Sequence, residues 1–189
     1  MTFSEAKIEL KEAQPSIILM SLLCGLSLLP LNIFLPSLPS ISADLTTSYG
    51  IIGLSLAGYT AASVIFEMIA GPLSDRYGRR PILLACLGIF IIGSIGCALA
   101  SNIWAFLVAR LLQAPVTSAY PLSMASIRDT SSKELAASRI GYVAMTAAVA
   151  PLLGPAIGGL IDQWFGWRLI FWLLGAAGVV CFLWCLLRL

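Results

Sequence analysis

Two ionisable residues, Glu67 and Arg110, lie inside long apolar blocks of the sequence. If those blocks cross a membrane, a charge within them is costly, about 2.5–3.5 kcal/mol for an arginine on insertion scales. Such a residue is a candidate for function, because its charge has to face a cavity or a partner. Glu67 can bind and release a proton, and either side chain can instead extend to the nearby membrane surface. The residues alone leave both alternatives open.

The amino-acid composition indicates that the apolar blocks are membrane spans. Hydrophobic residues make up 59% of the 189 and charged residues 11%, whereas soluble domains have about 45–50% and about 25%. The blocks have the length of about 20 residues that a helix needs to cross the hydrocarbon core. Short connections join them, such as a Pro/Ser-rich segment after the first span. We predict six helices, at residues 16–36, 49–70, 82–100, 103–127, 138–161 and 168–187.

Most Lys and Arg residues fall on one side of these predicted spans. The exceptions are Arg110, inside a span, and Arg168, on the other side. Because cytoplasmic loops of membrane proteins carry an excess of basic residues, we expect both termini in the cytoplasm, with residues 1–15 as a cytoplasmic lead-in. An aromatic belt is expected at the opposite surface, formed by Trp104, Trp164 and Trp167.

Other classes of function are disfavoured by what the sequence lacks. It has no histidine, and its five cysteines form no CxxC pair, so a metal site is not expected. An enzyme is not expected, because no nucleophile–base pair or paired acids are visible. A channel is not expected either, because the sequence shows no re-entrant segment that could form a pore filter. The net charge of +2 is too small to indicate a nucleic-acid partner.

The segment GPLSDRYGRRP, residues 71–81, concentrates four charges between positions 75 and 80. Anchoring the chain by positive charge would not require an acid among them. The order of its glycines and charged residues resembles that of the loop between the second and third helices of the major facilitator superfamily. That loop reads G-x-L-x-D-x-x-G-R-R/K. The matching residues are Gly71, Leu73, Asp75, Gly78, Arg79 and Arg80. By this resemblance the motif is a gate, in which Asp75, Arg79 and Asp129 form a cytoplasmic charge cluster.

The resemblance implies an all-α membrane fold. It would be a six-transmembrane-helix bundle built as a 3+3 inverted repeat, the N-terminal half of a major-facilitator fold. The first three-helix repeat would occupy residues 16–100 and the second residues 101–189.

A faint copy of the charged motif supports the inverted repeat. The segment GGLIDQWFGWR, residues 158–168, follows the fifth predicted span on the opposite side of the membrane. With one inserted residue, its Gly166 and Arg168 correspond to Gly78 and Arg80. Chance similarity between glycine-rich loops is the alternative.

Two further segments resemble motifs of the same family. LVARLLQAP resembles the fourth-helix pattern R-x-x-Q-G at Arg110 and Gln113, and in the family this arginine is tied to proton coupling. APLLGPAIGG resembles the antiporter signature G-x-x-x-G-P-x-x-G-G, which marks exporters and above all proton-exchanging drug pumps. A generic Pro-kinked helix is the alternative. The residues that match the signature are Gly154, Pro155, Gly158 and Gly159.

The end of the first span, LPLNIFLPSLPSI, resembles the Bcr/CflA branch of drug:proton antiporters within this family. That branch commonly has Asp where this chain has Asn32, and more often an amide where it has Glu67. Asparagine cannot ionise, so Asn32 and Gln113 are expected to line the substrate cavity, while Glu67 and Arg110 carry proton coupling. Either the proton site has moved to Glu67, or coupling is lost.

Six spans are half of what the resemblance implies, because family members have about twelve and bind substrate between two six-span halves. We expect proton-coupled efflux of small hydrophobic or cationic drugs across a bacterial inner membrane, with the proton gradient in place of a cofactor. The expected partners are the lipid bilayer, the drug, protons, and a complementary C-terminal half or a second copy. The alternative is a truncated or non-transporting half-transporter, self-pairing or serving as a structural membrane subunit. Removing Glu67 or Arg110 would distinguish an exporter from a structural subunit, because only a transporter would lose drug–proton exchange.

Overall fold

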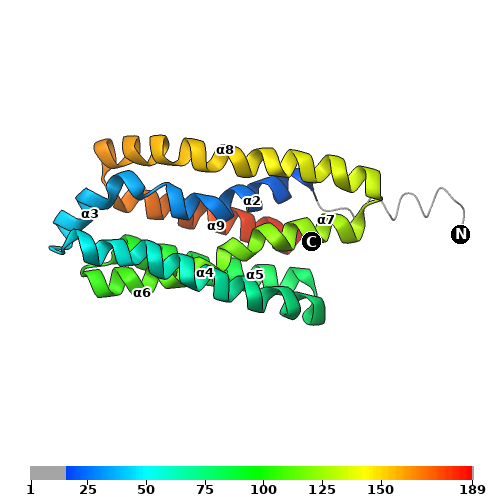
Figure 1. Ribbon diagram of the computed structural model, residues 1–189, viewed down its shortest axis with the longest axis horizontal. Helices are drawn as coiled ribbons and strands as arrows, with labels where there is room; N and C mark the ends of the chain where they lie inside the picture. The colour runs from blue at the N-terminus through cyan, green and yellow to red at the C-terminus, as the bar shows by residue number, and fades with distance from the viewer. Residues whose placement is uncertain (1–15, 189) are drawn as a thin grey trace, which may run out of the picture.

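The computed structural model describes residues 16–188, so the predicted lead-in at residues 1–15 lies outside the described residues. Within the described range the chain is helical and contains no strand, and the helices lie along a common axis as a bundle (Figure 1). In chain order the elements are α2 (Ile17–Asn32), the 3-10 helix η1 (Leu35–Ser37), α3 (Leu38–Asp44), α4 (Tyr49–Tyr77), α5 (Arg79–Leu99), α6 (Ile103–Gln113), the 3-10 helix η2 (Ala114–Ser118), α7 (Ala119–Thr130), α8 (Lys133–Phe165) and α9 (Arg168–Arg188).

These elements make six passes along the bundle, so the predicted all-α six-helix architecture is confirmed. The first pass consists of α2, η1 and α3, the fourth of α6, η2 and α7, and each other pass is a single helix. α2 begins and α9 ends at the same end of the bundle (Figure 1). Five of the passes are long and apolar enough to cross a membrane, and the fourth is divided by η2 into helices of 11 and 12 residues. Helical passes suit lipid, because they satisfy their backbone hydrogen bonds internally.

Several helices extend further than the sequence predicts. The Pro/Ser-rich segment after the first predicted span is mostly helical, because Pro36 and Pro39 occupy first-turn positions where a missing N–H costs nothing. The charged segment at residues 71–77 is not a turn but the last part of α4, and only Gly78 interrupts the helix. Hydropathy marks the part of a helix that lies in hydrocarbon, whereas its backbone hydrogen bonds continue beyond that boundary.

α4 and α8 end in the same way, at Gly78 and Gly166. The φ angles of these glycines, 94° and 82°, lie in the region that only glycine adopts readily, and their ψ angles are 155° and 157°. The N–H of each donates to the carbonyl four residues earlier, Ser74 O at 2.9 Å and Asp162 O at 3.0 Å. The second and fifth passes therefore end alike at opposite ends of the bundle, as an inverted repeat requires.

Two glycines allow helices to approach closely. A Cβ on Gly158 of α8 would overlap the carbonyl oxygen of Ile33, so α8 lies directly against the end of α2. A Cβ on Gly93 of α5 would lie 2.7 Å from the backbone nitrogen of Gln113 in α6. Close approach at small residues is how membrane helices gain packing energy, because lipid provides no hydrophobic drive between them.

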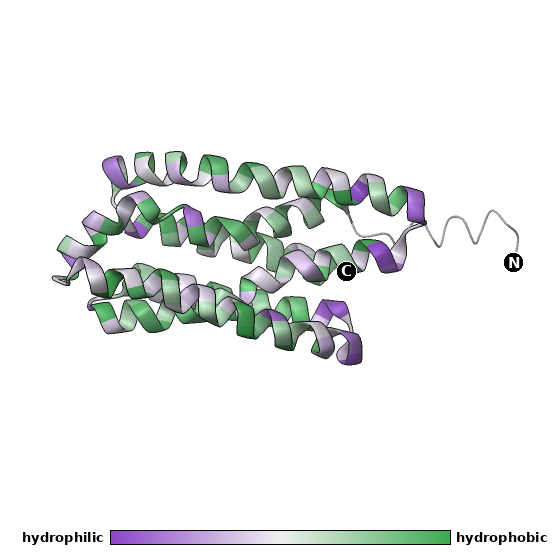
Figure 2. Cartoon of the chain, in the orientation of Figure 1, coloured by the Kyte–Doolittle hydropathy of each residue, from purple (hydrophilic) through white to green (hydrophobic). Residues whose placement is uncertain are grey.

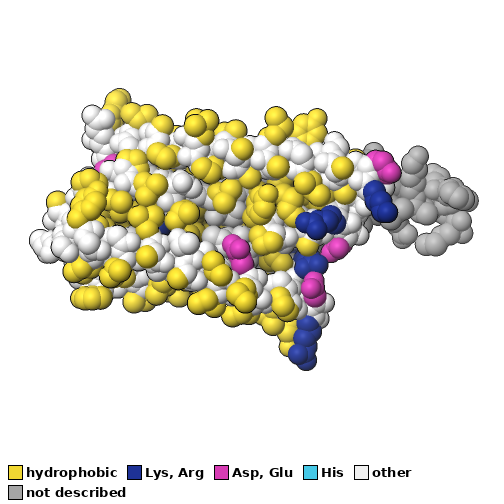
Figure 3. Space-filling model, viewed as in Figure 1, with side chains coloured by type: hydrophobic (Ala, Val, Ile, Leu, Met, Phe, Trp, Pro, Cys, Tyr) yellow, Lys and Arg dark blue, Asp and Glu magenta, His cyan; other side chains and the backbone are white. Residues whose placement is uncertain are grey.

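Charged side chains gather near the ends of the bundle, and hydrophobic side chains cover most of its length, as Figure 2 and Figure 3 show. We call the end that carries most of the Lys and Arg side chains the basic end, and the opposite one the far end. The ends of α4 and α7 and the starts of α5 and α8 lie there, and with them Arg76, Arg79, Arg80, Arg128 and Lys133.

The tryptophans at the far end differ in exposure. Trp104 and Trp164 are 67% and 74% exposed, as an aromatic belt requires. Trp167 is only 4% exposed, so its predicted place in the belt is wrong. Its indole packs edge-on against Phe106, with ring centres 5.7 Å apart, and so belongs to a buried aromatic cluster at the far end.

Candidate functional site

Arg110, in α6, is completely enclosed, with 0% of its surface exposed. Its guanidinium carbon lies 4.0 Å from the ring centre of Phe34, 4.6 Å from that of Tyr59 and 6.0 Å from that of Phe171. Aromatic faces attract a cation, most strongly where water is excluded. Arg110 therefore does not extend to the membrane surface but is a fixed charge inside a cage of aromatic rings.

A break in the first pass explains where Arg110 forms hydrogen bonds. α2 ends at Asn32 and η1 begins at Leu35, so the last carbonyls of α2 lack partners within the helix. Arg110 Nη1 donates to one of them, Pro30 O, at 3.1 Å. A cation at the C-terminal end of a helix also interacts favourably with the helix dipole. The guanidinium thus connects the fourth pass to the break in the first.

Gln113 and Ser94 extend the contacts of Arg110 into a hydrogen-bonded chain. Arg110 Nη1 donates to Gln113 Oε1 at 2.7 Å, and Gln113 Nε2 donates to Ser94 Oγ at 2.8 Å. The close approach at Gly93 brings α5 and α6 near enough for this contact. In the described part of the chain no carboxylate pairs with Arg110, and its Nε and Nη2 have no hydrogen-bond partner. The network therefore holds a positive charge that no nearby anion compensates.

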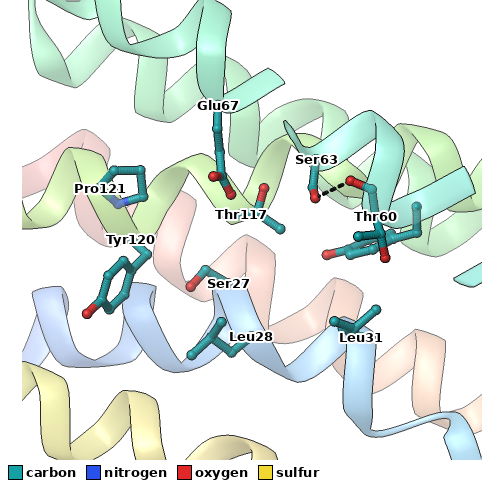
Figure 4. A pocket seen from close by; sticks show the side chains of 10 residues that line it. Ser27, Leu28, Leu31, Thr60, Ser63, Glu67, Thr117, Tyr120 and Pro121 are labelled. Carbon is teal, nitrogen blue, oxygen red and sulfur yellow. Dashed lines mark hydrogen bonds between the residues drawn. The ribbon is translucent and has the colours of Figure 1, made fainter. Parts of the chain in front are cut away.

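A pocket of about 290 Å³ opens between the first, second and fourth passes (Figure 4). Among the described residues that line it, Glu67 is the only carboxylate, and it extends from α4 toward Thr117 and the side chains of α2 (Figure 4). Hydroxyl groups and tyrosine rings form much of the remaining wall. The pocket can therefore hold a largely apolar molecule with hydrogen-bonding groups and a positive charge. The lining residues are Ser27, Leu28, Leu31, Tyr59, Thr60, Ser63, Glu67, Thr117, Tyr120 and Pro121.

Tyr59 separates the pocket from the cage around Arg110. Its ring lines the pocket and also lies against the guanidinium, and its buried hydroxyl has no hydrogen-bond partner among the residues that the structure describes. Arg110 itself does not line the pocket. A ligand in the pocket would therefore meet Glu67 directly and Arg110 only across the ring of Tyr59.

Asn32 and Gln113, both predicted to line the substrate cavity, do not line this pocket. Gln113 is fully buried in the network of Arg110. Asn32 Nδ2 donates to Leu28 O at 2.9 Å, and its Cβ lies beside Gly154 of α8. Successive helix residues point about 100° apart, so the helix turns Leu31 toward the pocket and Asn32 toward the fifth pass.

The residues of the antiporter signature lie against the break in the first pass. Gly158 contacts Ile33, and a Cβ on Gly159 would lie 3.5 Å from Pro36. Pro155 lies within α8, which remains helical on both sides of it. These residues bring the fifth pass close to the first rather than lining the pocket.

The charged motif brings its predicted gate residues together at the basic end. Arg79 Nη2 pairs with Asp75 Oδ1 at 2.7 Å, and Arg79 Nε pairs with Asp129 Oδ2 at 3.3 Å. Arg79 Nη1 also donates to Ser74 Oγ at 2.6 Å. These four residues, Ser74, Asp75, Arg79 and Asp129, are called the basic-end cluster below.

Of the other predicted gate residues, Gly78 ends α4, and Arg80 and Gly71 lie apart from this cluster. Arg80 Nη2 donates to Leu186 O at 2.8 Å, near the end of α9. Gly71 is inside α4, and a Cβ there would meet no atom within 4 Å. Arg80 therefore ties the start of the third pass to the end of the sixth, and nothing in the fold requires glycine at position 71.

No metal chemistry is suggested by the described residues. Their five cysteines are free and buried, and within this range no group of three or more His, Cys, Asp or Glu side chains is placed to hold a metal ion. The ionisable groups left for the site are Glu67, which faces the pocket, and Arg110, which lies behind it.

The residues that form the walls of the pocket and the cage of Arg110 were not predicted from the sequence. One signal was present, because Tyr59, Ser63 and Glu67 recur every four residues and thus share a helix face. Phe34 and Phe171 carried no signal, because they lie far apart in the sequence within apolar segments and meet only in the fold.

Comparison with known sequences identifies relatives of this chain. Residues 20–189 match the family model described as the Major Facilitator Superfamily. The chain is 36% identical over 162 residues to a chloramphenicol resistance protein of Pseudomonas aeruginosa, a match covering 85% of this chain and 39% of that protein. It is 35% identical over 182 residues to the uncharacterized MFS-type transporter YdgK of Bacillus subtilis (strain 168), covering 95% and 45%. It is 30% identical over 164 residues to multidrug resistance protein MdtL of Escherichia coli (strain SMS-3-5 / SECEC), covering 84% and 42%.

A solved structure shares the fold. The proton:xylose symporter XylE, bound to 6-bromo-6-deoxy-D-glucose, superposes with a TM-score of 0.80 at 16% identity, covering 94% of this chain and 44% of the symporter chain. The chain thus spans less than half the length of each of these relatives.

Proposed function

This chain belongs to the Major Facilitator Superfamily, and from that premise we propose that it forms the N-terminal six-helix half of a proton-coupled drug exporter of the Bcr/CflA type. Two relatives are named for resistance, one to chloramphenicol and one to multiple drugs. The proposed location is a bacterial inner membrane. The excess of Lys and Arg at the basic end supports an orientation with that end and both termini in the cytoplasm.

The position of Glu67 carries this proposal, because Glu67 is the only carboxylate among the described residues lining the pocket. Its carboxylate binds either a proton or the positive group of a drug. A drug that enters from the cytoplasm displaces the proton from Glu67, and a proton that arrives from outside later displaces the drug. The two therefore cross the membrane in opposite directions.

The charge of the drug decides which part of the proton gradient drives this exchange. Replacing one proton by one monovalent cation moves no net charge across the membrane. Exporting a neutral drug against one proton carries one positive charge inward, which a membrane potential favours by about 2.3 kcal/mol per 100 mV.

Arg110 acts on this exchange without touching the drug. Its fixed charge lies behind Tyr59 in a low-dielectric interior, and no carboxylate of the described residues pairs with it. Interactions between charges are strong in such surroundings. It repels a cation from that end of the pocket. The positive group of a drug is thus directed toward Glu67.

The basic-end cluster serves as the cytoplasmic gate in this proposal. Arg79 pairs with Asp75 and Asp129, which joins the ends of the second and fourth passes to the start of the third. The Asp75 side chain remains 64% exposed, so it is available to the N-terminal dipole of a helix in the other half. This contact would stabilise the state closed toward the cytoplasm.

The proposed partner is a complementary C-terminal six-helix half or a second copy of this chain. The most hydrophobic stretches of α4 and α8 are 22% and 17% buried, against 39–56% for the other long passes. These two passes therefore have the largest apolar faces available to a partner.

Proton movement in vesicles tests the proposal. The chain is expressed with its complementary half, and drug-driven proton flux is followed with a pH-sensitive dye for the wild type, Glu67→Gln and Glu134→Gln. Glu134 is exposed in the first turn of α8, so its variant is a matched control for losing a carboxylate. We expect Glu67→Gln to abolish the flux and Glu134→Gln to retain it.

The same vesicles test the alternative role. Equal flux in wild type and Glu67→Gln would refute exchange at this residue. If neither co-expression nor the chain alone gives drug-driven flux, while the chain remains inserted and associated with a partner, the structural-subunit role replaces the exporter.

A further inference from the structure

Two hydroxyl groups on the α4 wall of the pocket have already used their hydrogens. Thr60 Oγ1 bonds to Leu56 O at 2.9 Å, and Ser63 Oγ bonds to Thr60 O at 2.8 Å; Figure 4 draws the second of these bonds. A carbonyl oxygen has no hydrogen to give, so the hydroxyl is the donor in both. Such bonds to the preceding turn are a common choice for Ser and Thr inside a helix.

The remaining Ser and Thr side chains among the described lining residues follow the same rule. Thr117 Oγ1 donates to Ala114 O at 3.0 Å within η2, and Ser27 Oγ donates to Cys24 O at 2.7 Å within α2. A hydroxyl has one hydrogen and two lone pairs. Each of these oxygens can therefore still accept a hydrogen bond from a ligand, but it has no hydrogen left to donate to one.

The tyrosines of the pocket add little donor capacity. The hydroxyl oxygen of Tyr59 is buried and makes no hydrogen bond to the part of the chain that the structure describes, so a ligand meets the ring of Tyr59 rather than its hydroxyl. Of the side chains described in the wall, this leaves Tyr120 as the one whose hydroxyl hydrogen is available to a ligand.

Hydrogen-bond acceptors thus dominate the surface that a ligand would touch. Thr60 is exposed, Thr117 is half-buried and Ser63 is 9% exposed, whereas Ser27 is almost completely covered at 1%. Glu67 adds two carboxylate oxygens, which only accept when the group is ionised. A ligand that offers donors can pair with these oxygens, and a ligand that offers none leaves them without water and without a partner.

We propose that this pocket selects drugs by their hydrogen-bond donors, and that it takes protonated amines with several N–H groups in preference to quaternary ammonium cations. The proposal rests on the proposed function, because it takes the pocket to be the drug site. Ammonium N–H groups pair with hydroxyl and carboxylate oxygens in charge-assisted hydrogen bonds, which are shorter and stronger than neutral ones. A quaternary ammonium carries the same charge but has no N–H to offer.

Charge and apolar contact alone predict the opposite order of affinities. Methylation of an ammonium group leaves its charge unchanged and adds apolar surface, which favours transfer from water into a pocket. Aromatic faces such as that of Tyr59 also attract quaternary ammonium groups. A pocket that recognised only a positive charge and apolar surface would therefore bind the quaternary cation at least as tightly as the primary amine.

A methylation series of one probe tests the proposal. The protein, purified with its partner half in detergent, holds a fluorescent drug cation, which is displaced at neutral pH by 1-naphthylmethylammonium or by its N-methyl, N,N-dimethyl or N,N,N-trimethyl derivative. All four carry one positive charge, and the number of N–H donors falls at each step. We expect the affinity to fall with it, so that the trimethyl cation binds about tenfold more weakly than the primary amine.

Variants of this chain assign the preference to its own hydroxyl groups. Thr60→Val and Thr117→Val keep the side-chain shape and remove an acceptor, so each should weaken the primary amine about threefold and leave the trimethyl cation unchanged. Thr146→Val is the matched control, because Thr146 Oγ1 also donates to the carbonyl four residues earlier, Tyr142 O, but lies outside this pocket. Thr117→Ser keeps an acceptor and should retain the preference.

A trimethyl cation that binds as tightly as the primary amine would overturn the proposal, as would a failure of all four probes to displace the drug. An unchanged preference in both Thr60→Val and Thr117→Val would also overturn it. The assay needs no proton gradient. A preference for N–H donors without drug-driven proton flux would therefore retain the donor selection and reject the exporter, and flux without this preference would do the reverse.

Discussion

Glu67 and Arg110 lie on either side of Tyr59, yet their environments are opposite. Arg110 is enclosed by rings, a carbonyl and Gln113, whereas Glu67 is exposed at the wall of a pocket. A charge enclosed in this way is fixed by the fold, and it acts through its field. An exposed carboxylate can change its own state by exchanging ions. The fold thus separates two roles that the sequence presents as equivalent charges inside apolar blocks.

Replacing Arg110 with Met should have the largest effect on exchange. Methionine is uncharged and fits an apolar cage, but it leaves the acceptors Pro30 O and Gln113 Oε1 without their donor, at a cost of about 1–3 kcal/mol for each unsatisfied group. We therefore expect drug-driven proton flux to fall to background while the variant still folds and inserts, with a lower thermal unfolding temperature in detergent. A variant that exchanges at the wild-type rate would show that the fixed charge has no part in transport.

Replacing Gly93 with Ala should disturb the hydrogen-bonded network around Arg110 while leaving Glu67 in place. The added methyl would press on the backbone of Gln113 at 2.7 Å, and overpacking of this kind costs about 1–3 kcal/mol. Chemical denaturation in detergent measures the loss. Gly71→Ala is the matched control, because position 71 has open space, and alanine there should retain or slightly raise stability. Equal stability of the two variants would contradict the close crossing of α5 and α6.

The six passes were predictable because each is a long apolar block. The meeting of Asp75, Arg79 and Asp129 was expected from the resemblance of the charged segment to a family motif. The positions of Asn32 and Gln113 were not, because they depend on helix rotation and on a close crossing at Gly93. The cage of Arg110 could not be predicted either, since Phe34, Tyr59 and Phe171 belong to three different passes. Local pattern thus identified the charges, and only tertiary packing decided which of them faces the pocket.

Substitutions of Tyr59 should have the smallest effects, and they test the barrier between the two charges. Tyr59→Phe removes a buried hydroxyl that has no partner within residues 16–188, so stability and drug affinity should change little. Tyr59→Leu removes the ring that screens Arg110, so the affinity for a cationic drug should fall about tenfold, or ~1.4 kcal/mol. Equilibrium binding of a fluorescent drug cation measures both. Equal affinities for the Phe and Leu variants would mean that the ring does not separate the pocket from the guanidinium.

Proton release on drug binding tests the central claim most directly. The purified protein, with its partner half, is mixed with a drug cation in weakly buffered detergent solution, and the released protons are counted with a pH-sensitive dye. We predict that the wild type and Glu134→Gln release protons when the drug binds, and that Glu67→Gln binds drug without releasing any. Undiminished proton release from Glu67→Gln would contradict the assignment of Glu67 as the exchanging group.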